Sequence, residues 1–134
     1  MAIKTVFFDM SCVANSTSTV QSSLIDEKFI VLRVSAQFPI GVQGSLDVMV
    51  VATAESGLPT VGSRPTGQNI LATGSYSATA DPTIHGDGEI VAVDHFSDWN
   101  ENTYLKCYVK NNDLVNSHSC QVRVEIDDSL GELE

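Results

Sequence analysis

The side chains that come closest to a metal-binding set lie between residues 81 and 98. Acidic and histidine residues are closely spaced in this segment: Asp81, His85, Asp87, Glu89, Asp94, His95 and Asp98. Oxygen ligands at alternate positions of a glycine-containing loop can wrap a calcium ion. The segment has a lower density of carboxylates than a calcium-binding loop, so we expect solvated loop acids with no metal or cofactor. Zinc is not indicated, because the cysteines lack Cys-x-x-Cys spacing and the histidines are scattered.

The residues that could act as nucleophiles lack the spacing that catalysis uses. Serines are numerous, but no Gly-x-Ser-x-Gly turn precedes a helix, and no phosphate-binding loop or dinucleotide fingerprint is present. Asp94 and His95 are adjacent on a predicted strand, so their side chains point to opposite faces and are poorly placed for a dyad. Cys12 lies in an apolar strand pattern that is typical of a buried thiol. We therefore predict that the protein is not an enzyme.

Two runs in the last quarter of the chain alternate apolar and polar residues with a period of two. Their apolar positions share one face in each run: Leu105, Cys107, Val109, Cys120, Val122, Val124 and Ile126. Such alternation predicts strands with one buried face. The turn-rich residues 111–118 predict an antiparallel hairpin over 103–126, with Cys107 opposite Cys120. A disulfide between them is sterically conceivable, but a reducing compartment favours two packed thiols.

Similar patterns predict strands elsewhere in the chain. The expected ranges are 3–14, 20–25, 29–36, 46–53, 70–73, 76–80 and 89–96, with turns or loops at 15–19, 81–88 and 97–102. Residues 46–53 are almost all apolar, which indicates a strand buried on both faces or lying at an interface. There is no convincing amphipathic helix. Eight or nine short strands predict an all-β fold, a single antiparallel β-sandwich with immunoglobulin-like or jelly-roll Greek-key wiring.

The length and composition predict one domain over residues 1–134, with an extended N-terminal segment 1–5 and an acidic C-terminal tail 127–134. The formal net charge is −10, from 17 acidic and 7 basic residues. Such a surface repels phosphate backbones and anionic membranes, so we expect no nucleic-acid or membrane partner. The first residues lack the pattern of a signal peptide, and no apolar run is long enough to span a membrane. Synthesis in a cytoplasm is therefore expected.

The candidate partner-binding residues come from a loop and an aromatic corner. Residues 55–67 are rich in glycine and proline and long for a connection in a compact domain, so both a docking loop and a plain surface excursion fit them. Trp99, with Phe96 and Tyr104, fits an aromatic platform for a sugar or a partner, or a hydrophobic plug, which we favour. The candidate residues are Leu58, Pro59, Val61, Arg64, Pro65, Phe96 and Trp99.

Residues 103–111 and 120–126 resemble the last two strands of an immunoglobulin-like or fibronectin-type-III-like sandwich. The sequence departs from the antibody pattern in two ways. Tyr104 precedes Cys107 by three positions, and Trp99 lies in a corner instead of on an early strand. Jelly-roll wiring therefore remains an option beside the immunoglobulin wiring.

In size, acidity and abundance of Ser, Thr and Val, the chain also resembles virion accessory proteins of tailed bacteriophages, such as capsid decoration (cement) proteins. That resemblance implies a virion structural protein on the capsid exterior, made in the host cytoplasm, which bridges neighbouring capsid subunits. It implies the major capsid protein or other virion subunits as partners, and a homo-oligomer, in the form of a trimer. The alternative is a β-sandwich module that binds carbohydrate or a cell surface through the aromatic corner.

Overall fold

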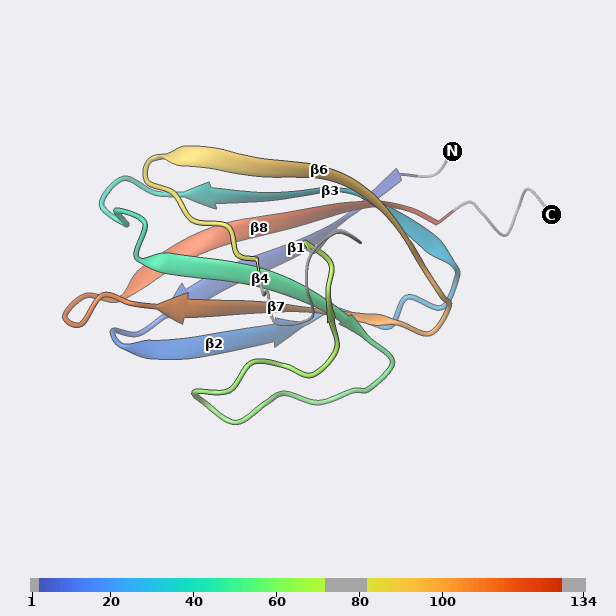
Figure 1. Cartoon of the computed structure of the whole chain (residues 1–134), viewed down its shortest axis with the longest axis horizontal. Coiled ribbons are helices and arrows are strands. Elements are labelled where there is room, and N and C mark those ends of the chain that lie inside the picture. Colours follow the sequence, from blue (N-terminus) through green and yellow to red (C-terminus); the bar gives the residue numbers. More distant parts are fainter. Residues whose placement is uncertain (1–2, 72–81, 129–134) are drawn as a thin grey trace.

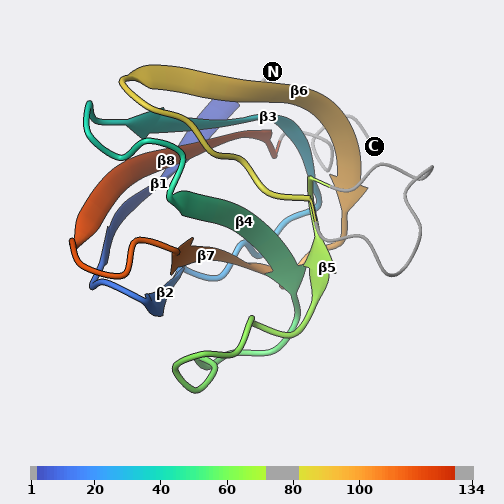
Figure 2. The ribbon, with the colours of Figure 1, turned by 60° about the vertical axis from the view of Figure 1, so that its left-hand side comes forward.

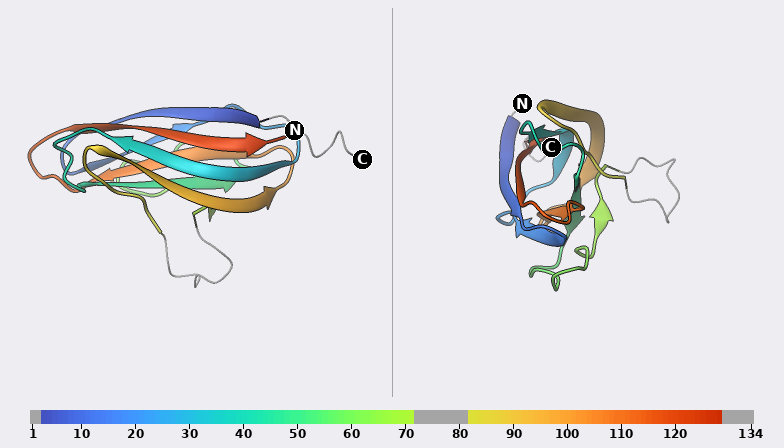
Figure 3. Two further views of the ribbon diagram at one scale, coloured as in Figure 1. Left: turned by 90° about the horizontal axis from the view of Figure 1, so that it is seen from above. Right: turned by 90° about the vertical axis from the view of Figure 1, so that its left-hand side faces the viewer.

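In the computed structural model, residues 3–71 and 82–128 are described, without the side chains of His95 and Phe96. The strands are β1 (Ile3–Cys12), β2 (Ser16–Gln21), β3 (Phe29–Phe38), β4 (Leu46–Thr53), β5 (Gln68–Asn69), β6 (Glu89–Trp99), β7 (Tyr104–Asn111) and β8 (His118–Asp127). They form two layers (Figures 1 and 3). Within the described ranges, no helix has the length and apolarity that a membrane crossing requires.

The wiring of the two sheets is that of a jelly roll. One sheet has the strand order β1-β8-β3-β6 and the other β2-β7-β4-β5, and all pairings are antiparallel. The first strand therefore pairs with the last, the second with the seventh, the third with the sixth and the fourth with the fifth. This nested pairing is a double Greek key. It confirms the predicted all-β antiparallel sandwich and selects the jelly roll from the two predicted wirings.

The predicted hairpin between the last two strands is wrong. β7 pairs with β2 and β4, whereas β8 pairs with β1 and β3 in the other sheet. The connection at residues 112–117 crosses from one sheet to the other. The two sheets of a sandwich lie about 10 Å apart. Cys107 and Cys120 thus belong to opposite sheets, and both are free thiols inside the sandwich. The predicted inward faces are correct, because these faces are buried whichever strands lie beside them.

Three other predictions also differ from the structure. The polar residues 16–19, expected in a turn, belong to β2, since alternating serine and threonine suit a half-buried edge strand. Trp99, expected in a corner, is the last residue of β6. The strand predicted at 70–73 is not formed at Ile70 and Leu71, where β5 has already ended at Asn69. The strand predicted at 76–80 lies outside the described residues.

The core lies between the two sheets and follows the period-two patterns. In β1, Phe8, Met10 and Cys12 are buried, and the prediction of a buried thiol at Cys12 is confirmed. In β3 the buried positions change parity, from Phe29 and Val31 to Val34, Ala36 and Phe38, at a register shift between Val31 and Arg33. A β-bulge adds one residue to a strand and so redirects every following side chain to the opposite face. This bulge keeps both halves of β3 pointing into the core.

Candidate docking surfaces

Residues 55–67, which we call the flap, cover the outer face of the sheet that contains β4 (Figure 2). Leu46, Val48 and Val50 belong to the core between the sheets, whereas Met49 and Val51 are buried on the other side of β4. Arg64 Nη2 lies 3.9 Å from Met49 Sδ. A Cβ atom added to Gly67 would lie 2.5 Å from Val51 Cγ1. The predicted burial of residues 46–53 on both faces is therefore confirmed, and the flap provides the second cover.

Hydrogen bonds from β2 and β7 hold the flap in place. Gly57 N donates to Gln21 Oε1 at 2.9 Å, and Gly62 N donates to Thr17 Oγ1 at 2.8 Å. Lys106 Nζ donates to Gly57 O at 2.6 Å. These bonds tie three backbone groups of the flap to side chains of β2 and β7, so the flap has a defined shape. Its two large apolar side chains, Leu58 and Val61, stay 62% and 80% exposed.

The structure brings together the five candidate residues of the flap and separates them from the aromatic corner. Leu58 and Val61 face solvent, Pro65 is buried, and Pro59 and Arg64 are half-buried. Trp99 lies on β6, in the opposite sheet, and packs against the core. Its Nε1 donates to Ser97 Oγ at 2.8 Å. This arrangement agrees with the plug that we favoured for Trp99, while the side chain of Phe96 lies outside the described part.

The β1–β2, β3–β4 and β7–β8 connections and the start of β6 lie at the end of the sandwich that faces the viewer in the right-hand panel of Figure 3. Five exposed apolar side chains lie on these three connections and at the start of β6, and we call them the apolar pole: Val13, Ile40, Ile90, Leu114 and Val115. Each is 62–90% exposed. Exposed apolar side chains on neighbouring loops form a candidate interaction site, because each loses contact with water only when a partner covers it.

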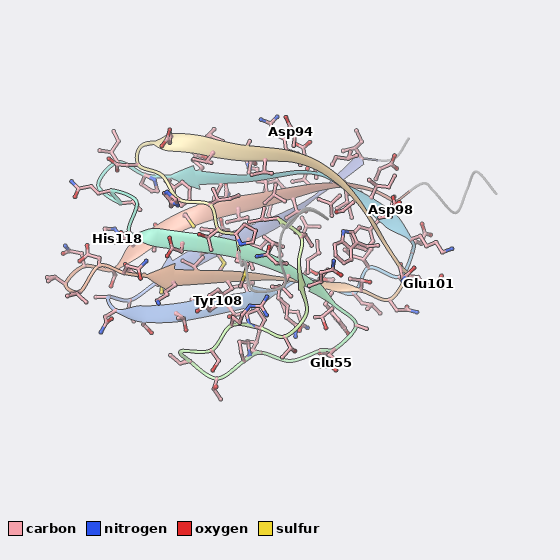
Figure 4. All side chains as sticks on the ribbon, viewed as in Figure 1. Glu55, Asp94, Asp98, Glu101, Tyr108 and His118 are labelled. Carbon is pink, nitrogen blue, oxygen red and sulfur yellow. The ribbon has the colours of Figure 1, made fainter. Side chains whose placement is uncertain are left out.

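Asp113 organises the β7–β8 connection that carries Leu114 and Val115. Its Oδ1 accepts hydrogen bonds from Val115 N at 2.9 Å and Asn116 N at 3.1 Å, and its Oδ2 lies 2.8 Å from His118 Nε2. Figure 4 labels His118 at this end of the sandwich. The hydrogen bond from Val115, followed by those from His118 and Asn116, lowers the pKa of Asp113. The Asp113 carboxylate, in its charged form, therefore holds the loop in place.

A buried asparagine links this connection to the β1–β2 turn. Asn111 is 1% exposed, and its Nδ2 donates to Cys12 O at 3.1 Å, Val13 O at 3.3 Å and Asn116 O at 3.0 Å. Asn15 N also donates to Asp113 O at 2.8 Å. Val13 and the Leu114–Val115 pair are thus held on one bonded framework.

The β3–β4 loop, which carries Ile40, joins the same framework. Asp87 Oδ1 accepts hydrogen bonds from Gly41 N at 2.8 Å and Gln43 N at 3.1 Å. Asn112 N, on the β7–β8 connection, donates to Ser45 O at 2.8 Å. The loops of the pole are therefore fixed before any partner arrives, which reduces the entropy lost on binding.

Two of the residues that came closest to a metal site have other roles in the structure. Asp87 caps the β3–β4 loop, and Asp94 forms an ion pair with Arg33 at 3.4 Å. Asp81 lies outside the described residues. Across residues 3–71 and 82–128, no three or more His, Cys, Asp and Glu side chains are grouped as a metal site would require.

The apolar pole is not predicted by the sequence patterns. Residues 111–118 predict a turn-rich connection and do not indicate that it presents a surface. One signal was available: Leu114 and Val115 are an apolar pair inside an otherwise polar segment of Asn, Asp, Ser and His. Ile40 and Val13, by contrast, are single apolar residues whose grouping with that pair depends on the folded topology.

No protein-family model and no curated protein matches this chain. Among solved structures, it is similar to a chain of the cyanophage Pam1 capsid asymmetric unit, with 13% identity and a TM-score of 0.45 over 92% of this chain and 83% of that one. It is similar to a chain of infectious bursal disease virus, Gt strain, with 6% identity and a TM-score of 0.42 over 96% and 32%. A Bacillus endospore appendage chain has 12% identity and a TM-score of 0.37 over 92% and 85%. These similarities concern the fold alone.

Proposed function

We propose that this chain is a non-enzymatic structural protein of a virion that binds the capsid exterior as a decoration (cement) protein. Its partners in this role are the major capsid protein or other virion subunits. The observation that carries the proposal is the pair of separate apolar surfaces, the flap and the apolar pole, on one sandwich. A protein that bridges two subunits needs two contact surfaces held at a fixed separation, and hydrogen bonds fix both surfaces here.

The fold and the charge are compatible with this role. Jelly rolls occur in viral capsid proteins and in lectins, so the fold narrows the field without selecting a function. The net charge of −10 opposes binding to nucleic acid and so favours contacts with protein. The virion setting comes from the resemblance in size and composition to bacteriophage accessory proteins.

Such a protein would act by adding contact area across the joints of the shell. Each copy would cover apolar surface on two neighbouring subunits, so that opening the joint exposes that surface to water again. Many copies would act together on one particle, and the second contact of each copy would form at high effective concentration. A modest affinity at each surface would therefore be sufficient.

The alternative, a carbohydrate-binding module, depends on an exposed aromatic platform. Trp99 is half-buried and packs against the core, and its Nε1–H is bonded to Ser97 within the same strand. The flat face that stacks on a sugar is therefore not freely presented. The geometry of Trp99 therefore does not favour the carbohydrate-binding role.

Immunogold electron microscopy on purified virus particles from the source of this sequence tests the proposal. An antibody against the purified chain is expected to label the outside of intact capsids at repeated positions. Labelling confined to tails, or no labelling of intact particles, would contradict a decoration role.

Rebinding to particles stripped of the chain then tests the two surfaces. Leu58→Ser with Val61→Ser alters the flap, and Leu114→Ser with Val115→Ser alters the pole. Both pairs are exposed, so the fold should be kept while occupancy falls at least tenfold. Ala92→Ser, at an exposed site on β6 outside both surfaces, is the control. Full occupancy with either double variant would remove that surface from the proposal.

A further inference from the structure

The first half of β1 is an edge without a neighbouring strand on one side. Within the described ranges, β8 is the only strand paired with β1. The end of β1 lies close to β2, since Cys12 Sγ donates to Ser16 O at 3.3 Å. Residues 4–7 instead border an open depression of about 500 Å³, lined in part by Val6, Leu24, Ile25 and Ile126. The unpaired backbone of an edge strand is a template for another strand.

The side chains of this edge are apolar on the outer face of the sheet. Ile3 and Phe7 are 55% and 58% exposed, and Thr5 lies exposed between them on the same face. Arg123 on β8 lies over the ring of Phe7, with 5.5 Å from its Cζ to the ring centroid. Ile3 and Phe7 are the large hydrophobic side chains that the outer face of β1 leaves in water.

This edge is complementary to itself in one antiparallel register. When Thr5 lies opposite Thr5 of a second copy, Ile3 of each copy lies opposite Phe7 of the other. Aliphatic–aromatic pairs directly across two strands stabilise a sheet. On the inner face, Val6 of the second copy comes beside Lys4 and points toward the depression. The single register therefore covers both exposed apolar side chains and reaches the open cavity.

The charge of the chain favours this edge over the other long edge strand. β6 has exposed acidic side chains at Glu89, Asp94 and Asp98, and Figure 4 labels the last two along that strand. Two copies joined through β6 would bring like charges together, which is how edge strands avoid pairing. Residues 3–7 carry one charged side chain, Lys4, and it is paired with Asp128. In a chain with a net charge of −10, residues 3–7 therefore bring fewer acidic side chains face to face than β6 would, although Asp26 and Asp128 also line the depression.

We propose that residues 3–7 of β1 pair with the same residues of a second copy across a two-fold axis at Thr5. The two four-stranded β1-β8-β3-β6 sheets thereby join into one continuous sheet. The contact is the same on both copies and closes on itself, so it produces a dimer and not the trimer expected from the sequence. The flap lies on the other sheet and the apolar pole at the far end of the sandwich, so both surfaces stay free.

The mass of the purified protein in solution tests the dimer, by sedimentation equilibrium over a range of concentrations. We expect the mass to rise from 14.4 kDa to twice that value. Only five residues of each β1 strand pair, so we expect a weak interface. The protein concentration should therefore extend to about 0.5 mM, where weak interfaces are populated. Thr5→Lys and Thr5→Glu each place like charges face to face at the axis and should give monomers. An equal mixture of the two variants should restore the dimer, because opposite charges then meet.

Matched changes on the other edge control for charge alone. Ala92 is exposed on β6, so Ala92→Lys and Ala92→Glu should keep the wild-type mass. Circular dichroism should show that all four variants fold. Thr5→Cys should form a cross-linked dimer on oxidation, since opposed Cα atoms lie about 4.5–5.5 Å apart.

Three results would overturn the dimer: a monomer at every concentration, a mass of three copies, or a wild-type mass in both Thr5 charge variants. Failure of the mixed variants to associate would reject the register. All these measurements use the chain in solution without particles, so their failure would leave the proposed capsid role untouched.

Discussion

The ammonium group of Lys106 donates a hydrogen bond to the backbone carbonyl of Gly57 at 2.6 Å, beneath the flap. Lys106 is 3% exposed although it lies on the outer face of its sheet, because the flap covers it. A buried charge requires a polar partner, and here the partner belongs to the flap itself. The position of the flap is therefore coupled to the charge on β7.

We predict that Lys106→Met loosens the flap without unfolding the sandwich. Methionine keeps the apolar stem of lysine and removes the hydrogen bond, which as a charge-assisted bond contributes about 1.5–3 kcal/mol. Opening of the flap should become at least about tenfold more frequent, since 1.4 kcal/mol corresponds to a factor of ten. Proteinase K cleavage within residues 55–67 measures this opening. Lys110→Met, on the exposed end of the same strand, is the control, and equal cleavage rates in the two variants would contradict the prediction.

A second prediction concerns the close contact between the flap and β4. A Cβ at Gly67 would lie 2.5 Å from Val51 Cγ1 and 2.7 Å from Ala52 O, and the φ angle of Gly67 is +134°. Gly67→Ala should lower the free energy of unfolding by about 2–3 kcal/mol, because overpacking adds to backbone strain. At Gly62 the φ angle is +94°, but nothing lies within 4 Å of the added atom. Gly62→Ala should therefore cost only about 1–2 kcal/mol. Urea unfolding of both variants measures the two losses of stability. A larger loss in Gly62→Ala than in Gly67→Ala would contradict the prediction.

The period-two patterns were sufficient to predict which side chains face the core, but not which strands are neighbours. Cys107 and Val122 face inward as expected, and they would do so beside any partner strand. The pairing of β8 with β1 joins residues more than a hundred positions apart, such as Phe8 and Val122, and no local pattern encodes it. The bulge in β3 was hidden for a similar reason, since it is a property of the β3 pairings with β6 and β8.

The two candidate surfaces show the same limit. The apolar run at 46–53 and the glycine-rich loop at 55–67 were both recognised, but the sequence could not show that one covers the other. That relationship depends on contacts such as Gly67 with Val51. It also means that deletion of residues 55–67 would uncover Met49 and Val51, so point variants at Leu58 and Val61 are the better test. The pole was missed because its members come from four separate connections and strand ends.

The three thiols give a prediction about reactivity. Burial raises the pKa of Cys107 well above its ordinary value and that of Cys120 to about 12, and it also raises the pKa of Cys12. Since the thiolate is the reactive form, the folded protein should show almost no reaction with Ellman's reagent at pH 8. Unfolding in guanidinium without reductant should make all three thiols of the chain react with the reagent. Fewer than three would reveal a disulfide, and rapid reaction of the folded protein would contradict the described burial.

The last prediction concerns Asp113 and acid. Its pKa is lowered because the folded carboxylate accepts hydrogen bonds from Val115, His118 and Asn116. A group with a lowered folded pKa adds stability that is fully present above its unfolded pKa, and that stability is lost as the pH falls through the folded pKa. Asp113→Asn removes the carboxylate with little change in size. The variant should be less stable than wild type at pH 7.

The difference in the free energy of unfolding between wild type and Asp113→Asn should then narrow as the solution is acidified below about pH 4. In this range the carboxyl of the unfolded chain begins to bind protons. Urea unfolding at pH 7, 5, 4 and 3 measures it, and Asp98→Asn, on β6, controls for the loss of one negative charge. A difference that stayed constant over this range would show that the carboxylate charge is not what holds the loop.

Hydrogen exchange at the Val115 amide should also be faster in Asp113→Asn at pH 7, because the hydrogen bond from Val115 N to the carboxylate, at 2.9 Å, is weakened. Loosening at this position would disorder the Leu114–Val115 pair and thereby reduce binding through the apolar pole.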